Sequence, residues 1–155
     1  MEKLIERVEY NTKVVKVTLK KVVDQPGVAA EIFALLGKHG LNIELISSCS
    51  AGQKRTDVSL AVLDSDIDEV VKILEAFCKK FGVKGIHVDK NVGIVLIFGE
   101  DLSRQPNVAS RIFRIISENS VNIEMINASM LVMNIVIDEK RIMDIVSSLR
   151  AEFLI

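Results

Sequence analysis

The chain has 155 residues, of which 49% are hydrophobic and 26% are charged, and it contains only eight glycines and two prolines. This composition is typical of a packed globular protein and excludes a disordered or fibrous chain. The 20 basic and 21 acidic residues give a formal net charge of -1. The chain as a whole therefore has no attraction for phosphate backbones or anionic lipid, and we expect no nucleic acid and no membrane as partners.

The two cysteines, Cys49 and Cys78, are too few for a disulfide framework and have no zinc-ligand spacing. The amino terminus MEKLIERVEY has no apolar signal region, and no apolar run approaches the length of a membrane helix. These features predict a cytoplasmic protein without a metal or cofactor.

The first half of the chain predicts one split βαβ unit. The β-branched run Val14–Leu19 predicts a strand, and apolar residues at helical spacing predict a helix from about Gly27 to His39. Two alternating stretches around the polar turn AGQK predict a hairpin, and Asp66 is an expected N-cap for a second helix. A short strand at Lys84–Val88 completes the order β-α-β-β-α-β, a ferredoxin-like α+β unit.

The second half of the chain repeats the first. The segment from Pro26 to Ser47 aligns without a gap to the segment from Pro106 to Asn127, at an offset of 80 residues, and nine of these 22 positions are identical. The run Val92–Phe98 precedes the second copy as a strand precedes the first. The sequence therefore predicts two ferredoxin-like βαββαβ units in tandem.

The second unit lacks its fourth strand, because the chain stops after a last helix from about Glu139 to Phe153. A sheet edge would stay uncovered unless another segment supplied that strand. The spare strand-like segment is Leu4–Tyr10. We therefore expect the first unit to span residues 13–90 and a discontinuous second unit to span residues 91–155 plus 3–12.

These two segments, DQPGVAAEIFALLGKHGLNIELIS with KRTDVSLAV and then NVASRIFRIISENSVNIEMIN, resemble the tandem ACT region of aspartate kinases, and the resemblance covers nearly the whole chain. It implies a non-catalytic, amino-acid-sensing regulatory module, with lysine or threonine as effector. It also implies a catalytic subunit as a possible partner. A homodimer is expected on separate grounds, because each sheet has helices on one face only and its Val- and Ile-rich strands leave apolar surface to be covered. The alternative is a free-standing ACT protein that serves another metabolic enzyme as a ligand-free dimerisation module.

The loop Asp24-Gln25-Pro26-Gly27-Val28-Ala29 is the main candidate site. It enters the first helix, where free backbone N–H groups and the positive dipole end favour a carboxylate. Gly27 would let a ligand approach the backbone, and Asp24 could pair with an ammonium group. The alternative is a plain helix start with Asp24 as its cap.

Further candidates follow this helix. Asn42 and Ile43 begin the next strand, where the Asn amide could reach a ligand or tie the strand to a loop. Ser48 and Cys49 stand where the ACT family has a Gln-Asn pair, on a polar run that could also be a solvent-facing hairpin flank. The second unit has Asn107 in place of Gly27 and Met130 in place of a family Glu, so we expect the effector site in the first unit.

No residue pattern predicts catalysis. The chain has no phosphate loop, dinucleotide fingerprint or nucleophile elbow. His39 and His87 have no metal-ligand spacing and are expected to be surface residues. The central strands also lack the aromatic residues on which RNA-binding members of this fold stack bases.

Overall fold

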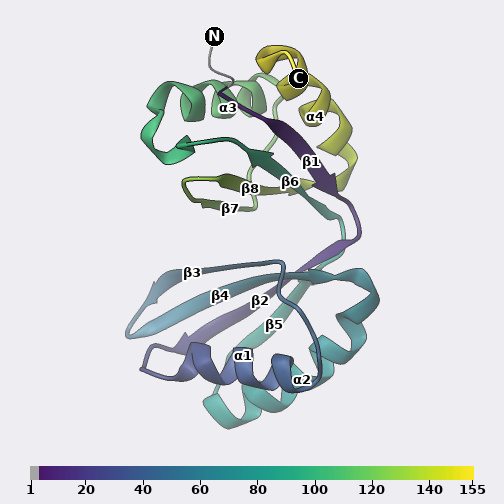
Figure 1. The fold of residues 1–155 in the computed structure, drawn as a ribbon. Coiled ribbons are helices and arrows are strands. Elements are labelled where there is room, and N and C mark those ends of the chain that lie inside the picture. Colours follow the sequence, from purple (N-terminus) through teal and green to yellow (C-terminus); the bar gives the residue numbers. More distant parts are fainter. Residues whose placement is uncertain (1–3) are drawn as a thin grey trace. The chain divides into compact units, whose positions relative to one another are not determined.

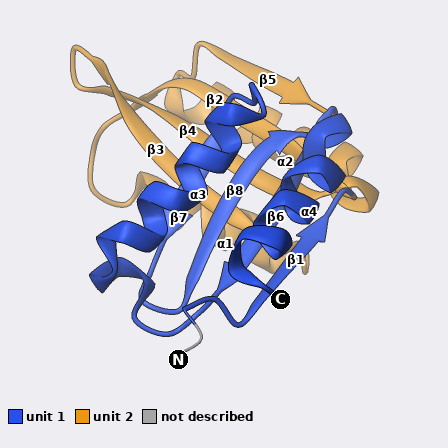
Figure 2. Ribbon diagram, turned by 90° about the horizontal axis from the view of Figure 1, so that it is seen from above, with its two compact units in different colours: residues 1–12, 91–155 blue, residues 13–90 orange. Residues whose placement is uncertain are grey.

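The computed structural model describes residues 4–155, which form two compact units (Figures 1 and 2). The first unit comprises residues 13–90 (orange, unit 2 in the key of Figure 2), and the second comprises residues 4–12 together with residues 91–155 (blue, unit 1 in that key). Each has one four-stranded antiparallel sheet and two helices that lie against one face of it. Among the described residues, no helix combines the length and apolar character needed to cross a membrane.

The first unit follows the predicted order β-α-β-β-α-β, and its strands lie in the order β3-β4-β2-β5. A short 3₁₀ turn, Asp64–Asp66, precedes its second helix. The elements are β2 (Val14–Val23), α1 (Val28–Lys38), β3 (Leu45–Gly52), β4 (Arg55–Leu63), α2 (Ile67–Phe81) and β5 (Gly85–Asp89). The expected ferredoxin-like fold is thus confirmed for this unit.

The predicted helix ends can be compared with the observed ones for α1 and for the start of α2. Helix α1 lies between Gly27 and His39 as its caps, and Gly40 has the left-handed φ of 69° expected after a helix end. Asp66 occupies the predicted N-cap position of α2, but its side chain makes no capping hydrogen bond, so the position is confirmed and the capping role is not. A capping side chain needs an extended backbone, whereas Asp66 ends the 3₁₀ turn with φ -101° and ψ -5°.

The core of the first unit lies between the sheet and its helices. Alternate residues of β2 and β4 face the helices, among them Val17, Leu19 and Leu60, all fully buried. They meet Ile32 of α1 and Leu74 of α2, both also fully buried. Each such aliphatic side chain contributes about 1.5–3 kcal/mol by leaving water, so this layer fixes where the start of α1 lies over the sheet.

The N-terminal strand completes the second unit, as the sequence predicts, but it spans Arg7–Asn11 rather than the expected Leu4–Tyr10. Strand β1 (Arg7–Asn11) pairs antiparallel with β6, with Arg7 opposite Phe98 and Asn11 opposite Ile94. The strands lie in the order β1-β6-β8-β7. The remaining elements are β6 (Val92–Phe98), α3 (Pro106–Glu118), β7 (Met125–Ala128), β8 (Val132–Asp138) and α4 (Ile142–Phe153).

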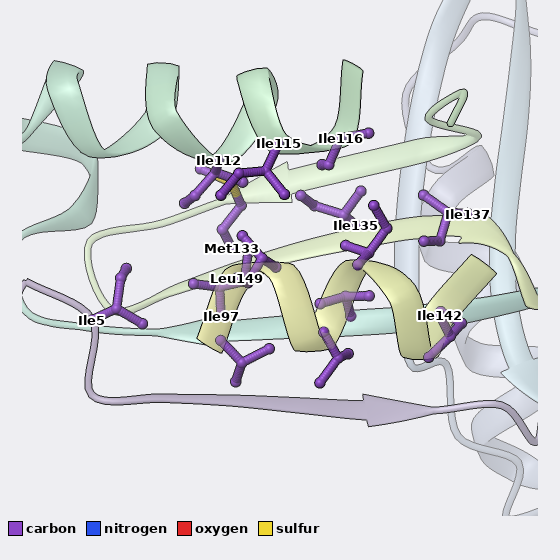
Figure 3. Packing of buried hydrophobic residues seen from close by; sticks show 14 of the residues in the cluster. Ile5, Ile97, Ile112, Ile115, Ile116, Met133, Ile135, Ile137, Ile142 and Leu149 are labelled. Atoms are coloured by element: carbon purple, nitrogen blue, oxygen red, sulfur yellow. The ribbon is translucent and has the colours of Figure 1, made fainter. Parts of the chain in front are cut away.

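The core of this unit is built mainly from isoleucines (Figure 3). Ile97 of β6 and Ile135 of β8 are buried beneath Ile112 of α3. Ile5, which precedes β1, is only 1% exposed and belongs to the same cluster. The N-terminal segment therefore supplies both a strand and core side chains.

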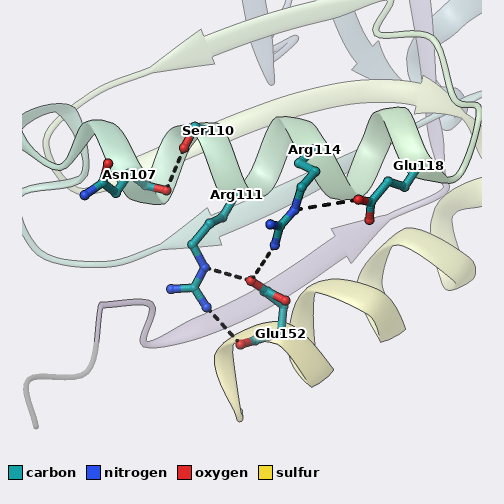
Figure 4. A network of polar contacts seen from close by, with 6 residues as sticks. All are labelled: Asn107, Ser110, Arg111, Arg114, Glu118 and Glu152. Carbon is teal, nitrogen blue, oxygen red and sulfur yellow. Dashed lines mark hydrogen bonds and ion pairs between the residues drawn. The ribbon is translucent and has the colours of Figure 1, made fainter.

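A polar network joins the two helices of the second unit (Figure 4). The Arg111 side chain donates to Glu152 Oε1 at 2.7 Å and to the Glu152 carbonyl oxygen at 3.1 Å, and Arg114 donates to the same carboxylate at 3.0 Å. The hydrogen bond from Arg111 lowers the pKa of the Glu152 carboxyl below its ordinary value. The carboxylate is therefore held in its charged form.

Candidate functional site

A pocket of about 360 Å³ lies in the first unit beside the start of α1. The end of β2, the loop into α1, and strands β3 and β4 all contribute to it. The lining residues are Val22, Val23, Asp24, Gln25, Val28, Ala29, Ser48, Ser50, Thr56 and Val58. Its floor is apolar, because Val22, Val28 and Val58 are buried.

The sheet side of the pocket follows from the register of the β3–β4 hairpin. Ser48 lies opposite Val58, and Ser50 lies opposite Thr56. Cross-strand partners point to the same face of a sheet, and Val58 belongs to the core beneath the helices. Three hydroxyl side chains therefore stand above a valine floor on the face that carries α1.

The helix side of the pocket is the N-terminus of α1. The N-cap is Gly27, and no side chain caps the helix there. The Asp24 backbone N–H donates to the Lys54 carbonyl oxygen at 2.9 Å, which ties the loop to the β3–β4 turn. The structure therefore contradicts the alternative that Asp24 is the cap of this helix.

The charges at this pocket suit a zwitterion. The Asp24 side chain makes no ion pair within residues 4–155, so its negative charge is available to a cation. The start of α1 supplies N–H groups and the positive end of the helix dipole. One negative side chain and one positive helix end can bind the ammonium and carboxylate groups of a small amino acid.

The pocket brings together five of the nine residues proposed from the sequence, namely Asp24, Gln25, Val28, Ala29 and Ser48. The other four do not line it. Cys49 pairs with Asp57 on the opposite face of the sheet, because side chains alternate along a strand. Asn42 and Ile43 do not begin the strand as expected, because β3 starts at Leu45. They follow the C-terminal end of α1, at the opposite end of that helix from the pocket.

Gly27 lies in the loop between residues that line the pocket, and the backbone conformation at this position favours glycine. Its φ is 91°, in the left-handed region that L residues avoid. A Cβ atom there would meet nothing within 4 Å. Replacing Gly27 would therefore strain the loop itself, so such a variant is a poor probe of ligand contact.

The sequence analysis did not identify the lining residues Val22, Val23, Thr56 and Val58, and it placed Ser50 in the polar run without selecting it as a site residue. Alternation along β3 pairs Ser50 with Ser48 on one face and would have favoured Ser50 over Cys49. Thr56 lies opposite Ser50 because of the register of the hairpin. That register depends on the geometry of the turn, which the sequence does not specify.

The corresponding loop of the second unit is built differently. At the offset of 80 residues, Leu102 replaces Val22 and Arg104 replaces Asp24. Leu102 is buried in the core, and its backbone N–H donates to the Met130 carbonyl oxygen at 2.8 Å. Arg104 would repel an ammonium group where Asp24 would attract it.

The second hairpin is also too short to form the same wall. Strand β7 ends at Ala128, which corresponds to Ser48, and a turn around Ser129 follows at once. The Ser129 hydroxyl accepts hydrogen bonds from the backbone N–H groups of Leu131 and Val132 at 3.4 and 3.2 Å. The hydroxyl pair formed by Ser50 and Thr56 in the first unit therefore has no counterpart here.

A second hollow, of about 500 Å³, lies in the second unit near the end of α3, and Asn122 lines it together with Ser117, Phe113 and Ile123. A helix C-terminus presents carbonyl groups and the negative dipole end, which disfavours a carboxylate ligand. Phe113 and Ile123 are both 37% exposed. The surface is more suited to an apolar contact than to an amino acid.

The two histidines are surface residues of the first unit. His39 lies 3.7 Å from Glu69 and is exposed, as is His87. Within residues 4–155, no three His, Cys, Asp or Glu side chains are grouped so that they could hold a metal ion.

Comparison with known proteins identifies both units. The ACT-domain family matches residues 17–81 and, through a second ACT-domain profile, residues 95–153. An aspartate kinase of Stutzerimonas stutzeri is 27% identical over 150 residues, which are 97% of this chain and 36% of that protein. The chain thus spans about a third of the length of the curated relatives it matches.

Solved structures agree with this comparison. A crystal structure of aspartokinase alpha and beta subunits contains a chain that is 25% identical, with a TM-score of 0.87 and coverage of 97% of this chain and 99% of that one. The regulatory subunit of aspartate kinase from Thermus thermophilus shares the fold with a TM-score of 0.89, at 23% identity and coverage of 96% and 98%. The chain therefore belongs to the ACT-domain family, as two ACT domains in tandem that are homologous to the regulatory region of aspartate kinases.

Proposed function

We propose that this chain is the non-catalytic, amino-acid-sensing regulatory part of an aspartate kinase, and that its effector binds in the pocket at the start of α1. The observation that carries the proposal is that two complementary groups lie at one pocket, beside the hydroxyl groups of Ser48 and Thr56. One is the Asp24 carboxylate, which makes no ion pair within the described chain, and the other is the N-terminus of α1, which no side chain caps. The homology to aspartate kinases supports a regulatory role. Within that role we propose lysine or threonine as the effector, as the family resemblance of the sequence implies.

A thermal-shift screen of the twenty amino acids tests this function. A ligand that binds only the folded state stabilises it by RT ln(1 + [L]/Kd), which is about 2.7 kcal/mol at a hundredfold excess over Kd. We expect lysine or threonine to raise the melting temperature and most other amino acids to leave it unchanged. A screen in which none of the twenty raises it would contradict the sensing function and favour the dimerisation module.

Two substitutions locate the ligand. Ser48→Ala and Thr56→Val each remove a hydroxyl group that lines the pocket, and we expect either to reduce the thermal shift, because the ligand loses a hydrogen-bond partner. Ser47→Ala is the matched control, since Ser47 is the neighbouring residue on β3 and faces the other side of the sheet. If Ser47→Ala reduced the shift as much as Ser48→Ala, the pocket assignment would be wrong.

We also propose that the chain forms a homodimer through the second unit. Phe113, Ile123 and Ile126 are between 37% and 39% exposed, and Ile126 lies on the edge strand β7. Exposed apolar residues beside an unpaired strand edge are typical of an interface. The same surface suits the alternative function as a dimerisation module.

Light scattering tests the homodimer. We expect twice the chain mass of 17.2 kDa for the unmodified protein and a shift towards the monomer for Ile126→Lys, because a charged side chain resists burial. Met143→Lys is the control, since Met143 is an exposed apolar residue on α4. A monomeric mass for the unmodified protein at micromolar concentration would refute this assembly.

A further inference from the structure

Strand β2 contains a bulge directly before the pocket. Leu19 pairs with Val58 and Val22 pairs with Thr56, so β2 advances three residues while β4 advances two. Lys20 and Lys21 together lie opposite Asp57. Lys21 has a φ of 55°, in the left-handed region that a lysine disfavours.

The bulge decides which side chain forms the wall of the pocket. Side chains alternate along a strand, and Val17 and Leu19 face the helices. Without the extra residue, Lys21 would face them next. With it, Val22 does so, is 1% exposed and lines the pocket, while both lysine side chains remain exposed.

The Asp57 carboxylate holds this bulge from the opposite face of the sheet. Its Oδ1 accepts a hydrogen bond from the Lys21 backbone N–H at 2.8 Å, and its Oδ2 accepts one from Lys20 Nζ at 3.3 Å. Arg55 donates from its guanidinium to the Lys21 carbonyl oxygen at 3.2 Å. The bond from Lys21 lowers the pKa of Asp57, so its carboxylate stays charged.

We propose that Asp57 is a positioning residue for the effector pocket, although it does not line it. Its carboxylate keeps Lys21 in the left-handed conformation and thereby seats Val22 beside Thr56. This inference rests on the proposed function, because it holds that the Asp57–Lys21 hydrogen bond, which lies behind the pocket wall, controls the affinity of the pocket for its effector.

The test uses four variants. Asp57→Ala removes the bond to Lys21, whereas Asp57→Asn keeps an oxygen that can accept it. The double variant Asp57→Ala with Lys21→Gly removes the bond but places a glycine where φ is positive, which restores the bulge at little strain. Ser59→Ala is the matched control, since it removes a hydrogen bond to Thr18 at 3.1 Å on the same face of β4.

Two measurements are made on each variant. The first is the nuclear Overhauser contact between the methyl groups of Val22 and Thr56 in the ligand-free protein. The second is the dissociation constant for lysine and for threonine, measured by calorimetry. The first reports the bulge alone, and the second reports its consequence for binding.

We expect Asp57→Ala to lose the Val22–Thr56 contact and to bind at least about tenfold more weakly. The hydrogen bond from the Lys21 N–H to the charged Asp57 carboxylate keeps the binding-competent wall populated, and the apparent affinity falls with that population. Asp57→Asn and the double variant should retain both, as should Ser59→Ala. The proposal is overturned if Asp57→Ala keeps the contact, or if the double variant binds as weakly as Asp57→Ala. If the unmodified protein binds neither amino acid, the proposed function fails, and the methyl contact still decides the role of Asp57.

Discussion

Removing residues 1–11 should unfold the second unit and leave the first unit folded. The deletion removes the whole of β1 and leaves the edge of β6 unpaired over five residues. It also removes Ile5 and Val8, which are 1% and 3% exposed, and the Val8 carbonyl oxygen to which Arg150 donates at 2.8 Å. Losing a buried aliphatic side chain costs about 2–5 kcal/mol, and a whole domain is stable by only about 5–15 kcal/mol.

Methyl-resolved NMR separates the two units in one experiment. We expect the methyl signals of Ile97, Ile112 and Ile135 to lose their native dispersion. The methyl signals of Ile32 and Leu74 in the first unit should keep theirs. Glu9→Ala is the control, because it changes an exposed side chain of β1 without removing the strand. Native dispersion throughout the truncated protein would show that β1 is dispensable.

The substitution Gly99→Ala should destabilise the second unit strongly. An added Cβ would lie 2.5 Å from the Leu4 carbonyl oxygen and 2.9 Å from Leu102 Cδ2. Because the nearer atom belongs to the backbone, it cannot rotate away, and the N-terminal segment must shift. Overpacking of this kind costs about 1–3 kcal/mol, and displacement of β1 would add to it.

Chemical denaturation measures this effect, with Gly85→Ala as the matched control. Gly85 also lies at a strand, β5, and an added Cβ there meets nothing within 4 Å. We expect the control to change the free energy of unfolding by less than about 0.5 kcal/mol, as is usual for open sites. Equal stabilities for the two variants would mean that the N-terminal segment does not pack against Gly99.

The sequence predicted most of the fold because each element has its own pattern. The strand Val92–Phe98 was predicted at its observed bounds, since a continuous β-branched run marks a buried strand. The repeat fixes how many strands each unit needs, and it therefore predicts that the N-terminal segment supplies the fourth strand of the second unit. The capping role of Asp66 failed, because the sequence does not reveal the 3₁₀ turn that sets its backbone.

The candidate site was only partly predictable. The loop residues Asp24 to Ala29 follow from helix-start chemistry, which is local in the sequence. The opposite wall depends on pairing between strands, so the place of Thr56 opposite Ser50 required the hairpin register. The place of Val22 depends on a bulge held by Asp57, 35 residues away in sequence.

Titration of the ¹⁵N-labelled chain with lysine and with threonine tests the central claim, that the first unit binds an amino acid at the start of α1. We expect saturable shifts of the backbone amide signals of Gly27, Ala29, Ser48, Ser50 and Thr56 with at least one of the two amino acids. The signals of Ser117 and Asn122, at the hollow of the second unit, should stay in place. Saturable shifts confined to Ser117 and Asn122 would contradict the account, as would the absence of any saturable shift with both amino acids.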